Sequence, residues 1–93
     1  MIKSFKNKNT ELIFNLKANN RYPYHIQKKA LKLLLLIDTV ESVNDLRYPQ
    51  GNHLEKLTGD RSDTYSIRIN KQYRICFRVN GNIFEDVEIV DYH

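Results

Sequence analysis

An α+β fold, with two N-terminal helices on one face of a mostly antiparallel sheet, is predicted by three observations on this 93-residue chain. Between Tyr24 and Thr39 the apolar residues recur every three or four positions, the period of a helix. From Tyr65 onward they alternate, which is typical of strands with one buried face. The helical pattern precedes the strand pattern, and the length suits one domain over residues 1–93.

Capping and turn residues bound the expected elements. Asn9 or Thr10 is expected to cap a short first helix, ahead of the helix from Tyr24 to Thr39. Ser42, with Asp45 three residues later, predicts one further helical turn. Strands are expected over residues 2–5, 53–57, 65–69, 73–79 and 83–89.

The second helix has an apolar face and a cationic face. Its apolar stripe is Ile26, Ala30, Leu33, Leu34 and Ile37, and the opposite face carries His25, Lys28, Lys29 and Lys32. Leu31, Leu35 and Leu36 widen the apolar arc beyond what one sheet needs. They indicate either a second core contact with the first helix or a docking surface for a partner protein.

In the last strand, Ile83, Val87 and Ile89 are expected to face the core.

Charge and cysteine content favour a cytoplasmic protein with a polyanionic partner. Residues 1–32 hold eight Lys or Arg against Glu11 alone, whereas residues 33–93 hold seven against ten acids. Such asymmetry favours nucleic acid as a partner, although it is also typical of a solvated face. The lone Cys76 fits a reducing compartment. The longest apolar run, 33–37, is far shorter than the about 20 residues of a membrane span, so no membrane partner is expected.

The alternation around residue 70 predicts how two strands pair. If one face is buried throughout, Ile69 must lie opposite Tyr73, around a loop of residues 70–72. The same register places Arg68 opposite Arg74 on the other face. Like charges in opposed positions destabilise a hairpin unless an anion lies between them.

We therefore expect an arginine surface that meets a phosphate. Guanidinium groups form bidentate hydrogen bonds with phosphate oxygens. Three arginines fall on this face, namely Arg68, Arg74 and Arg78. Arg61, in the preceding loop, is expected to join them. The alternative is an ordinary surface salt bridge from Glu88 to Arg74.

The sequence ends on three acid/base groups, Asp91, Tyr92 and His93. A protonated imidazole beside arginines can donate a proton to a leaving oxygen, while Asp91 orients it or accepts a proton. The alternative is that these three residues form a frayed chain end with no catalytic role. The three histidines share no metal-ligand spacing and the glycines form no phosphate-binding loop, so neither a metal nor a cofactor is expected.

Three segments resemble the HigB-type toxins of bacterial toxin–antitoxin modules, in the RelE/ParE superfamily. They are residues 52–61, the block 65–77 that contains Tyr-Arg-Ile-x-Phe, and the final Asp-Tyr-His. The resemblance implies a ribosome-dependent endoribonuclease that cuts mRNA. It also implies an antitoxin with a helix-turn-helix domain, which neutralises the toxin and through which the complex binds operator DNA. Arg74 would stabilise the phosphate, and Asp91, Tyr92 and His93 would position the RNA and move protons.

One departure from the family pattern affects the expected site. Many members read Leu-His-Pro-Leu-Lys-Gly where residues 54–59 here read Leu-Glu-Lys-Leu-Thr-Gly, so the family histidine falls on Glu55 and its lysine on Thr58. His53 and Lys56 lie two residues earlier than the positions they would fill. We expect Glu55 in the site, His53 and Lys56 as RNA-binding residues, and weaker or slower cleavage.

Without a metal, the nucleophile available on RNA is its own 2′-OH, which would leave a 2′,3′-cyclic phosphate. Two rival functions remain open. One is a non-enzymatic toxin, such as the gyrase poisons of the ParE branch. The other is a regulatory module that binds ribosomal RNA without cutting it.

Overall fold

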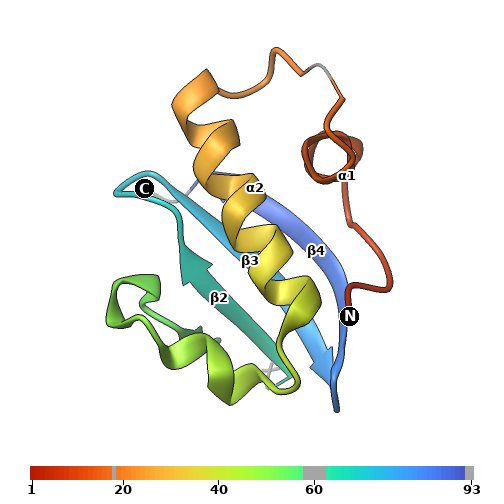
Figure 1. Ribbon diagram of the computed structural model, residues 1–93, viewed down its shortest axis with the longest axis vertical. Helices are drawn as coiled ribbons and strands as arrows, with labels where there is room; N and C mark the ends of the chain where they lie inside the picture. The colour runs from red at the N-terminus through yellow and green to blue at the C-terminus, as the bar shows by residue number, and fades with distance from the viewer. Residues whose placement is uncertain (18, 58–62, 92–93) are drawn as a thin grey trace.

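The computed structural model describes residues 1–17, 19–57 and 63–91, in which two helices cover one face of a sheet (Figure 1). The helical elements are α1 (Lys8–Phe14), α2 (Tyr24–Thr39) and the 3-10 helices η1 (Val43–Arg47) and η2 (Gln50–Asn52). The strands are β1 (Glu55–Lys56), β2 (Thr64–Arg68), β3 (Tyr73–Asn80) and β4 (Ile83–Asp91). They lie in the order β1-β2-β3-β4, and each neighbouring pair is antiparallel. The predicted α+β architecture is confirmed.

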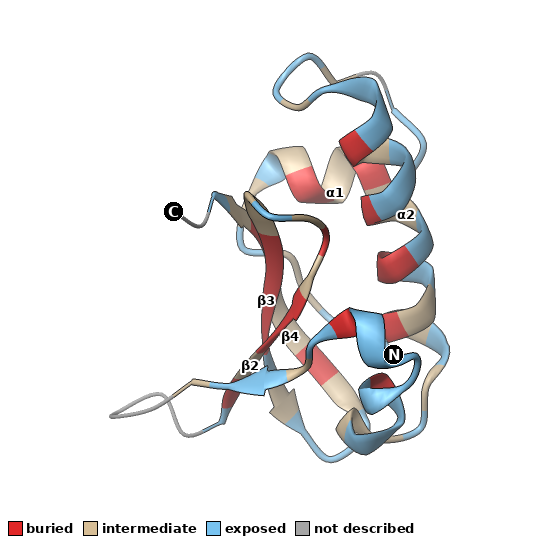
Figure 2. Cartoon of the chain, turned by 90° about the vertical axis from the view of Figure 1, so that its left-hand side faces the viewer, coloured by how far each residue is buried: buried red, intermediate tan, exposed pale blue. Residues whose placement is uncertain are grey.

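The core lies between α2 and the sheet (Figure 2). The stripe predicted for α2 is buried in full, and on the sheet it meets the buried side chains of Ile67, Ile69, Ile75 and Phe77. Leu31 and Leu36 are partly buried and pack against this core. Leu35 remains 48% exposed.

The N-terminal segment differs from the expected strand. It makes two isolated parallel bridges to β4, from Ile2 to Phe84 and from Phe5 to Val87. The cap of α1 is also earlier than expected, because the side-chain oxygen of Asn7 accepts the backbone N–H of Thr10 at 2.9 Å. The prediction of Asn9 or Thr10 as the cap was therefore wrong by two or three positions.

Thr10 joins α1 to the last strand from a fully buried position. Its hydroxyl accepts the backbone N–H of Ile89 at 2.9 Å and donates to Asn7 Oδ1 at 2.8 Å. A single side chain thus provides the partner for a strand N–H that the core would otherwise leave unpaired.

A β-bulge changes which residues of β4 face the core. The β3–β4 register shifts between Cys76 and Arg78, and Asp86 adopts a left-handed φ of 52°. The extra residue reverses the alternation of side chains in the part of β4 that precedes it. Phe84 is therefore fully buried where we expected Ile83, because the expectation assumed unbroken alternation.

The chain between α2 and the sheet follows the predicted turns. The expected turn after Ser42 is η1, in which Asp45 Oδ2 accepts the backbone N–H of Ser42 at 3.3 Å. The expected strand over residues 53–57 shortens to β1.

In the described part of the chain, no helix is long and apolar enough to cross a bilayer.

Replacing Thr10 by Val should lower the free energy of unfolding by about 1–3 kcal/mol, because the buried N–H of Ile89 loses its acceptor. Urea unfolding followed by circular dichroism measures the change. Thr39→Val is the matched control, since Thr39 is exposed and its loss should cost under about 0.5 kcal/mol. Equal effects of the two variants would contradict the role of Thr10.

Candidate active site

The two arginines that the strand pattern set face to face are paired in the structure. Arg68 lies opposite Arg74 in the β2–β3 ladder, and Ile67 lies opposite Ile75. Both isoleucines are buried on the helix side, so the arginine side chains point to the other face. The register predicted from the sequence is confirmed.

Arg74 is buried on this face of the sheet, with only 7% of the residue exposed. Its Nε donates to Ser66 Oγ at 2.9 Å, and its Nη2 donates to the carbonyl oxygens of His53 at 2.6 Å and Ser66 at 3.3 Å. These bonds direct the guanidinium across β2 toward β1. A guanidinium held in one orientation is suited to stabilising charge that develops at a fixed point.

Glu55 lies at the open end of this arrangement. Its Oε2 is 3.9 Å from Arg74 Nη2, and its side chain is 57% exposed. Glu55 is paired with Ser66, so both side chains share the face of Arg74. We call Arg74, Ser66, Glu55 and the His53 carbonyl the Arg74 cluster. It places a proton acceptor beside a fixed cation, on the side that solvent reaches.

His53 enters the cluster through its backbone. It ends η2 in a left-handed conformation, with φ 46° and ψ 56°, and its carbonyl accepts from Arg74. Buried Asn52 holds this turn by donating from Nδ2 to the carbonyls of Leu46 at 3.2 Å and Tyr48 at 3.3 Å. The imidazole of His53, which we predicted to bind RNA, belongs to an exposed residue.

Two predicted site residues lie on the opposite face from Arg74. Lys56 pairs with Tyr65, and its Nζ lies 5.9 Å from the centre of that ring. Asp91 pairs with Tyr73, and its Oδ2 accepts from Gln72 Nε2 at 3.2 Å. The structure therefore brings Glu55 to Arg74 and leaves Lys56 and Asp91 apart from it.

The charges of Arg68 and Arg78 are directed to partners within the chain. Arg68 Nε donates to the Asn70 carbonyl at 3.1 Å. Arg78 makes ion pairs with Asp63 at 3.1 Å and with Asp86 at 3.4 Å. Arg78 thus meets two carboxylates on the surface where we predicted contact with a phosphate.

The expected alternative partner of Arg74 lies elsewhere. Glu88 is opposite Cys76, and its carboxylate is 4.0 Å from Lys6 Nζ. Among the ion pairs of the described residues, Arg74 is paired with Glu55, at 3.9 Å. Arg61, Tyr92 and His93, along with Thr58, lie outside the described residues.

Asp91 lines a separate polar pocket of about 370 Å³, at the end of the sheet where β3 begins and β4 ends. Arg21, Tyr22 and Tyr73 also line this pocket. Burial raises the pKa of the Tyr22 phenol above its ordinary value, against the lowering effect of Arg21. The ring of Tyr22 packs edge-on against Tyr73, with centroids 5.5 Å apart.

Sequence reasoning missed Ser66 and the His53 carbonyl, which accept hydrogen bonds from Arg74. Ser66 was recognisable only as a residue on the same face as Arg74, and the His53 carbonyl has no side-chain signal at all. Among the residues that the structure describes, no three His, Cys, Asp or Glu side chains gather as a metal site would require.

Comparison with known proteins identifies relatives along the whole chain. A model of HigB-like toxins, described as the RelE-like toxin of type II toxin–antitoxin system HigB, matches residues 3–93. Toxin HigB-1 of Vibrio cholerae is 35% identical over 79 residues, which are 84% of this chain and 83% of that protein. Endoribonuclease HigB of Proteus vulgaris is 33% identical over 94 positions that cover both chains completely. An uncharacterized protein of Haemophilus influenzae is 39% identical over 65 residues, 70% of this chain and 64% of that protein.

Solved structures share the fold. A chain of the YoeB–YefM complex from Staphylococcus aureus superposes with a TM-score of 0.63 at 27% sequence identity. The match covers 100% of this chain and 95% of that one.

The Arg78 ion pair generates a pH prediction. The hydrogen bond from Arg78 lowers the pKa of the Asp63 carboxyl, so the pair persists above the ordinary carboxyl pKa and is lost as pH falls through the lowered value. Arg78→Gln should raise the pKa of Asp63 toward its ordinary value in a carbon-13 NMR titration. Arg47→Gln, at an arginine that bonds to Asn44 instead, should leave it unchanged. An unaltered Asp63 titration in Arg78→Gln would contradict the pairing.

Proposed function

Because the chain belongs to the HigB family of RelE-like toxins, we propose that it is an endoribonuclease that cuts mRNA on the ribosome without a metal ion. The observation that carries this proposal is the guanidinium of Arg74, held by Ser66 and the His53 carbonyl beside Glu55. A full-length relative that bears the name endoribonuclease supports RNA as the substrate.

The proposed reaction uses the nucleophile that RNA itself carries. The 2′-OH attacks the adjacent phosphorus in line, the new O2′–P bond forms and the P–O5′ bond breaks. The products are a 2′,3′-cyclic phosphate and a 5′-OH. Negative charge grows on the phosphate oxygens in the transition state, and Arg74 is the cation oriented to stabilise it. DNA, which lacks the 2′-OH, should not react.

Protons must leave the 2′-OH and reach the departing 5′ oxygen. We assign the first transfer to Glu55, because its exposed carboxylate lies beside Arg74. The resemblance to HigB toxins assigns the second transfer to His93, with Tyr92 positioning the RNA. Asp91 is assigned a positioning role from its own pocket, because it faces away from Arg74.

Two partners complete the proposal. The ribosome would hold the mRNA in the geometry for in-line attack, so free RNA should be a poor substrate. An antitoxin with a helix-turn-helix domain would neutralise the protein, and only this complex would bind the operator DNA. The likeness to a chain of the YoeB–YefM complex supports an antitoxin partner.

Arg74→Ala should reduce cleavage of ribosome-bound mRNA by about 10²–10³-fold, because the transition-state charge loses its cation. Arg78→Ala is the matched control on the same strand and face, and should change the rate by less than about threefold, because Arg78 is already paired with carboxylates. Primer extension on stalled ribosomes measures both rates. Thermal unfolding identifies a variant that has lost its fold. Arg74→Lys provides a second test, because lysine keeps the positive charge but lacks the bidentate hydrogen bonding of a guanidinium group.

Mapping the 5′ ends of cellular mRNA after induction separates the proposal from its rivals. Codon-phased cuts with 5′-OH ends support the endoribonuclease. DNA breaks without RNA cuts indicate a gyrase poison, and toxicity with neither lesion indicates an RNA-binding module. Either of the last two results would overturn the proposal.

A further inference from the structure

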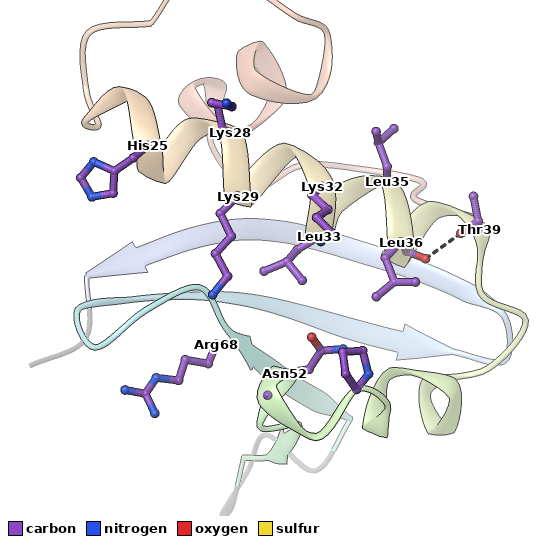
Figure 3. Close-up of a pocket in the computed structure, with 12 residues that line it drawn as sticks. His25, Lys28, Lys29, Lys32, Leu33, Leu35, Leu36, Thr39, Asn52 and Arg68 are labelled. Atoms are coloured by element: carbon purple, nitrogen blue, oxygen red, sulfur yellow. Dashed lines mark hydrogen bonds between the residues drawn. The ribbon is translucent and has the colours of Figure 1, made fainter.

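Two of the hollows on the described surface differ in chemistry. The larger, a groove of about 960 Å³ along α2, is lined by leucines and by Lys28, Lys29 and Lys32, with no Asp or Glu among its described residues (Figure 3). The smaller is the polar pocket of about 370 Å³ described above, which has a guanidinium and a carboxylate, those of Arg21 and Asp91. We call it the Asp91 pocket. It suits a ligand that carries hydrogen-bond acceptors and donors together.

Segments that are distant in the sequence meet in the Asp91 pocket, beside β4 at the edge of the sheet. Its polar side chains include those of Asn7, Arg21 and Asp91, and its walls include Tyr22, Tyr73 and Ile89. The two tyrosine rings are nearly perpendicular, at 86°, and Ile89 is buried. Aromatic and apolar walls beside a few polar groups are typical of sites that hold a flat heterocyclic ring.

The hydrogen-bonding capacities of the polar side chains are divided between donors and an acceptor. Asn7 Oδ1 already accepts from the backbone N–H of Thr10 at 2.9 Å and from its hydroxyl at 2.8 Å. Both lone pairs of that oxygen are thereby used, so Asn7 offers a ligand only its NH₂ group. Arg21 also only donates. Asp91 Oδ2 accepts from Gln72 Nε2 at 3.2 Å, and a carboxylate has further acceptor sites.

We propose that the Asp91 pocket binds a guanine base. Guanine presents two adjacent donors, N1–H and the N2 amine, next to two acceptors, O6 and N7. Asp91 would accept from the two donors, while Arg21 and the NH₂ group of Asn7 would donate to the two acceptors. Tyr22 and Tyr73 would enclose the ring, as aromatic side chains do around unstacked bases of RNA.

The other bases of RNA fit less well. Adenine and cytosine would each offer the Asp91 carboxylate one donor beside the lone pair of a ring nitrogen. Uracil has a single N–H, flanked by two carbonyl oxygens that the carboxylate would repel. A phosphate group would meet Arg21 but would also be repelled by Asp91.

The guanine can come from an RNA strand or from a free nucleotide. Arg74 is paired with Val90, the residue before Asp91, so an RNA strand held at the Arg74 cluster would pass near the pocket. For that source the inference rests on the proposed function and adds the identity of one base to it. A free guanine nucleotide would instead make the pocket a regulatory site.

The first test measures which nucleotides the purified chain binds, from the ring signals of Tyr22 and Tyr73 in a carbon-13 NMR titration. The probes are guanosine, inosine and adenosine monophosphate, which share ribose and phosphate. Inosine lacks the N2 amine, and adenosine lacks both N1–H and O6. We expect guanosine monophosphate to bind at least about fivefold more tightly than the inosine probe and about tenfold more tightly than the adenosine probe. Equal binding of all three, or no shift of either ring, would overturn the proposal.

The second test exchanges the preference for one base for another. Asp91→Asn should bind adenosine monophosphate more tightly than guanosine monophosphate, because an amide both donates and accepts, as adenine requires. Arg21→Gln should weaken binding of guanosine monophosphate by about tenfold without this reversal. The matched control is Arg47→Gln, at an exposed arginine outside the pocket, which should change it by less than about twofold. Thermal unfolding identifies a variant that has lost its fold, and a folded Asp91→Asn variant that still prefers guanine would overturn the proposal.

The third measurement identifies the source of the base. A guanine at a fixed distance from the mapped mRNA cuts, lost in Arg21→Gln, would support a base of the RNA strand. Binding of guanosine monophosphate without such a preference would support a free nucleotide. A different base at that distance, also lost in Arg21→Gln, would overturn the proposal. The titrations need neither ribosome nor cleavage, so failure of the proposed RNA cleavage and failure of this inference are distinguishable.

Discussion

The pairing of Ile69 with Tyr73 decides which face of the sheet receives Arg74. The backbone N–H of Ile69 donates to the Tyr73 carbonyl at 2.9 Å, and the side chain of Asn70 accepts the N–H groups of Gln72 at 2.8 Å and Tyr73 at 2.7 Å. A slip by one residue would place the arginines under the helices and the isoleucines in solvent. The apolar core and the Arg74 cluster therefore depend on one register, which the loop side chain of Asn70 helps to hold.

Within that register, the orientation of Arg74 depends on segments that are distant in the sequence. Ser66 comes from the neighbouring strand, and the His53 carbonyl comes from a turn that Asn52 stabilises from within the core. A buried guanidinium requires such acceptors, because an unpaired buried charge is costly. The same bonds that satisfy Arg74 also fix its direction, so stability and site geometry have one origin.

The cationic residues of the chain have different environments despite their common charge. Arg74 is buried within backbone and hydroxyl acceptors, and Arg78 is paired with carboxylates at the surface. Lys29 and Lys32 belong to α2, which packs on the other face of the sheet from Arg74. Part of the positive charge of residues 1–32 therefore lies on a surface separate from the Arg74 cluster.

Sequence periodicity predicted the architecture, the α2 stripe and the arginine pairing, because each follows from which residues face the core. It could not predict the ion pairs of Arg78, since the position of Asp86 depends on a bulge that interrupts the alternation. Nor could it place Lys56, because the pairing of β1 with β2 has no apolar pattern to define its register. The role of His53 was hidden for a different reason, since a backbone carbonyl leaves no trace in residue type.

The central claim, that the guanidinium of Arg74 is fixed by Ser66 and His53, is tested most directly by hydrogen exchange of the Arg74 Nε–H in nitrogen-15 NMR. We predict exchange much slower than that of the exposed Arg47 Nε–H, and loss of that protection in Ser66→Ala while the β2–β3 amides stay protected. Arg74 exchange as fast as that of Arg47 in the unaltered protein would contradict it.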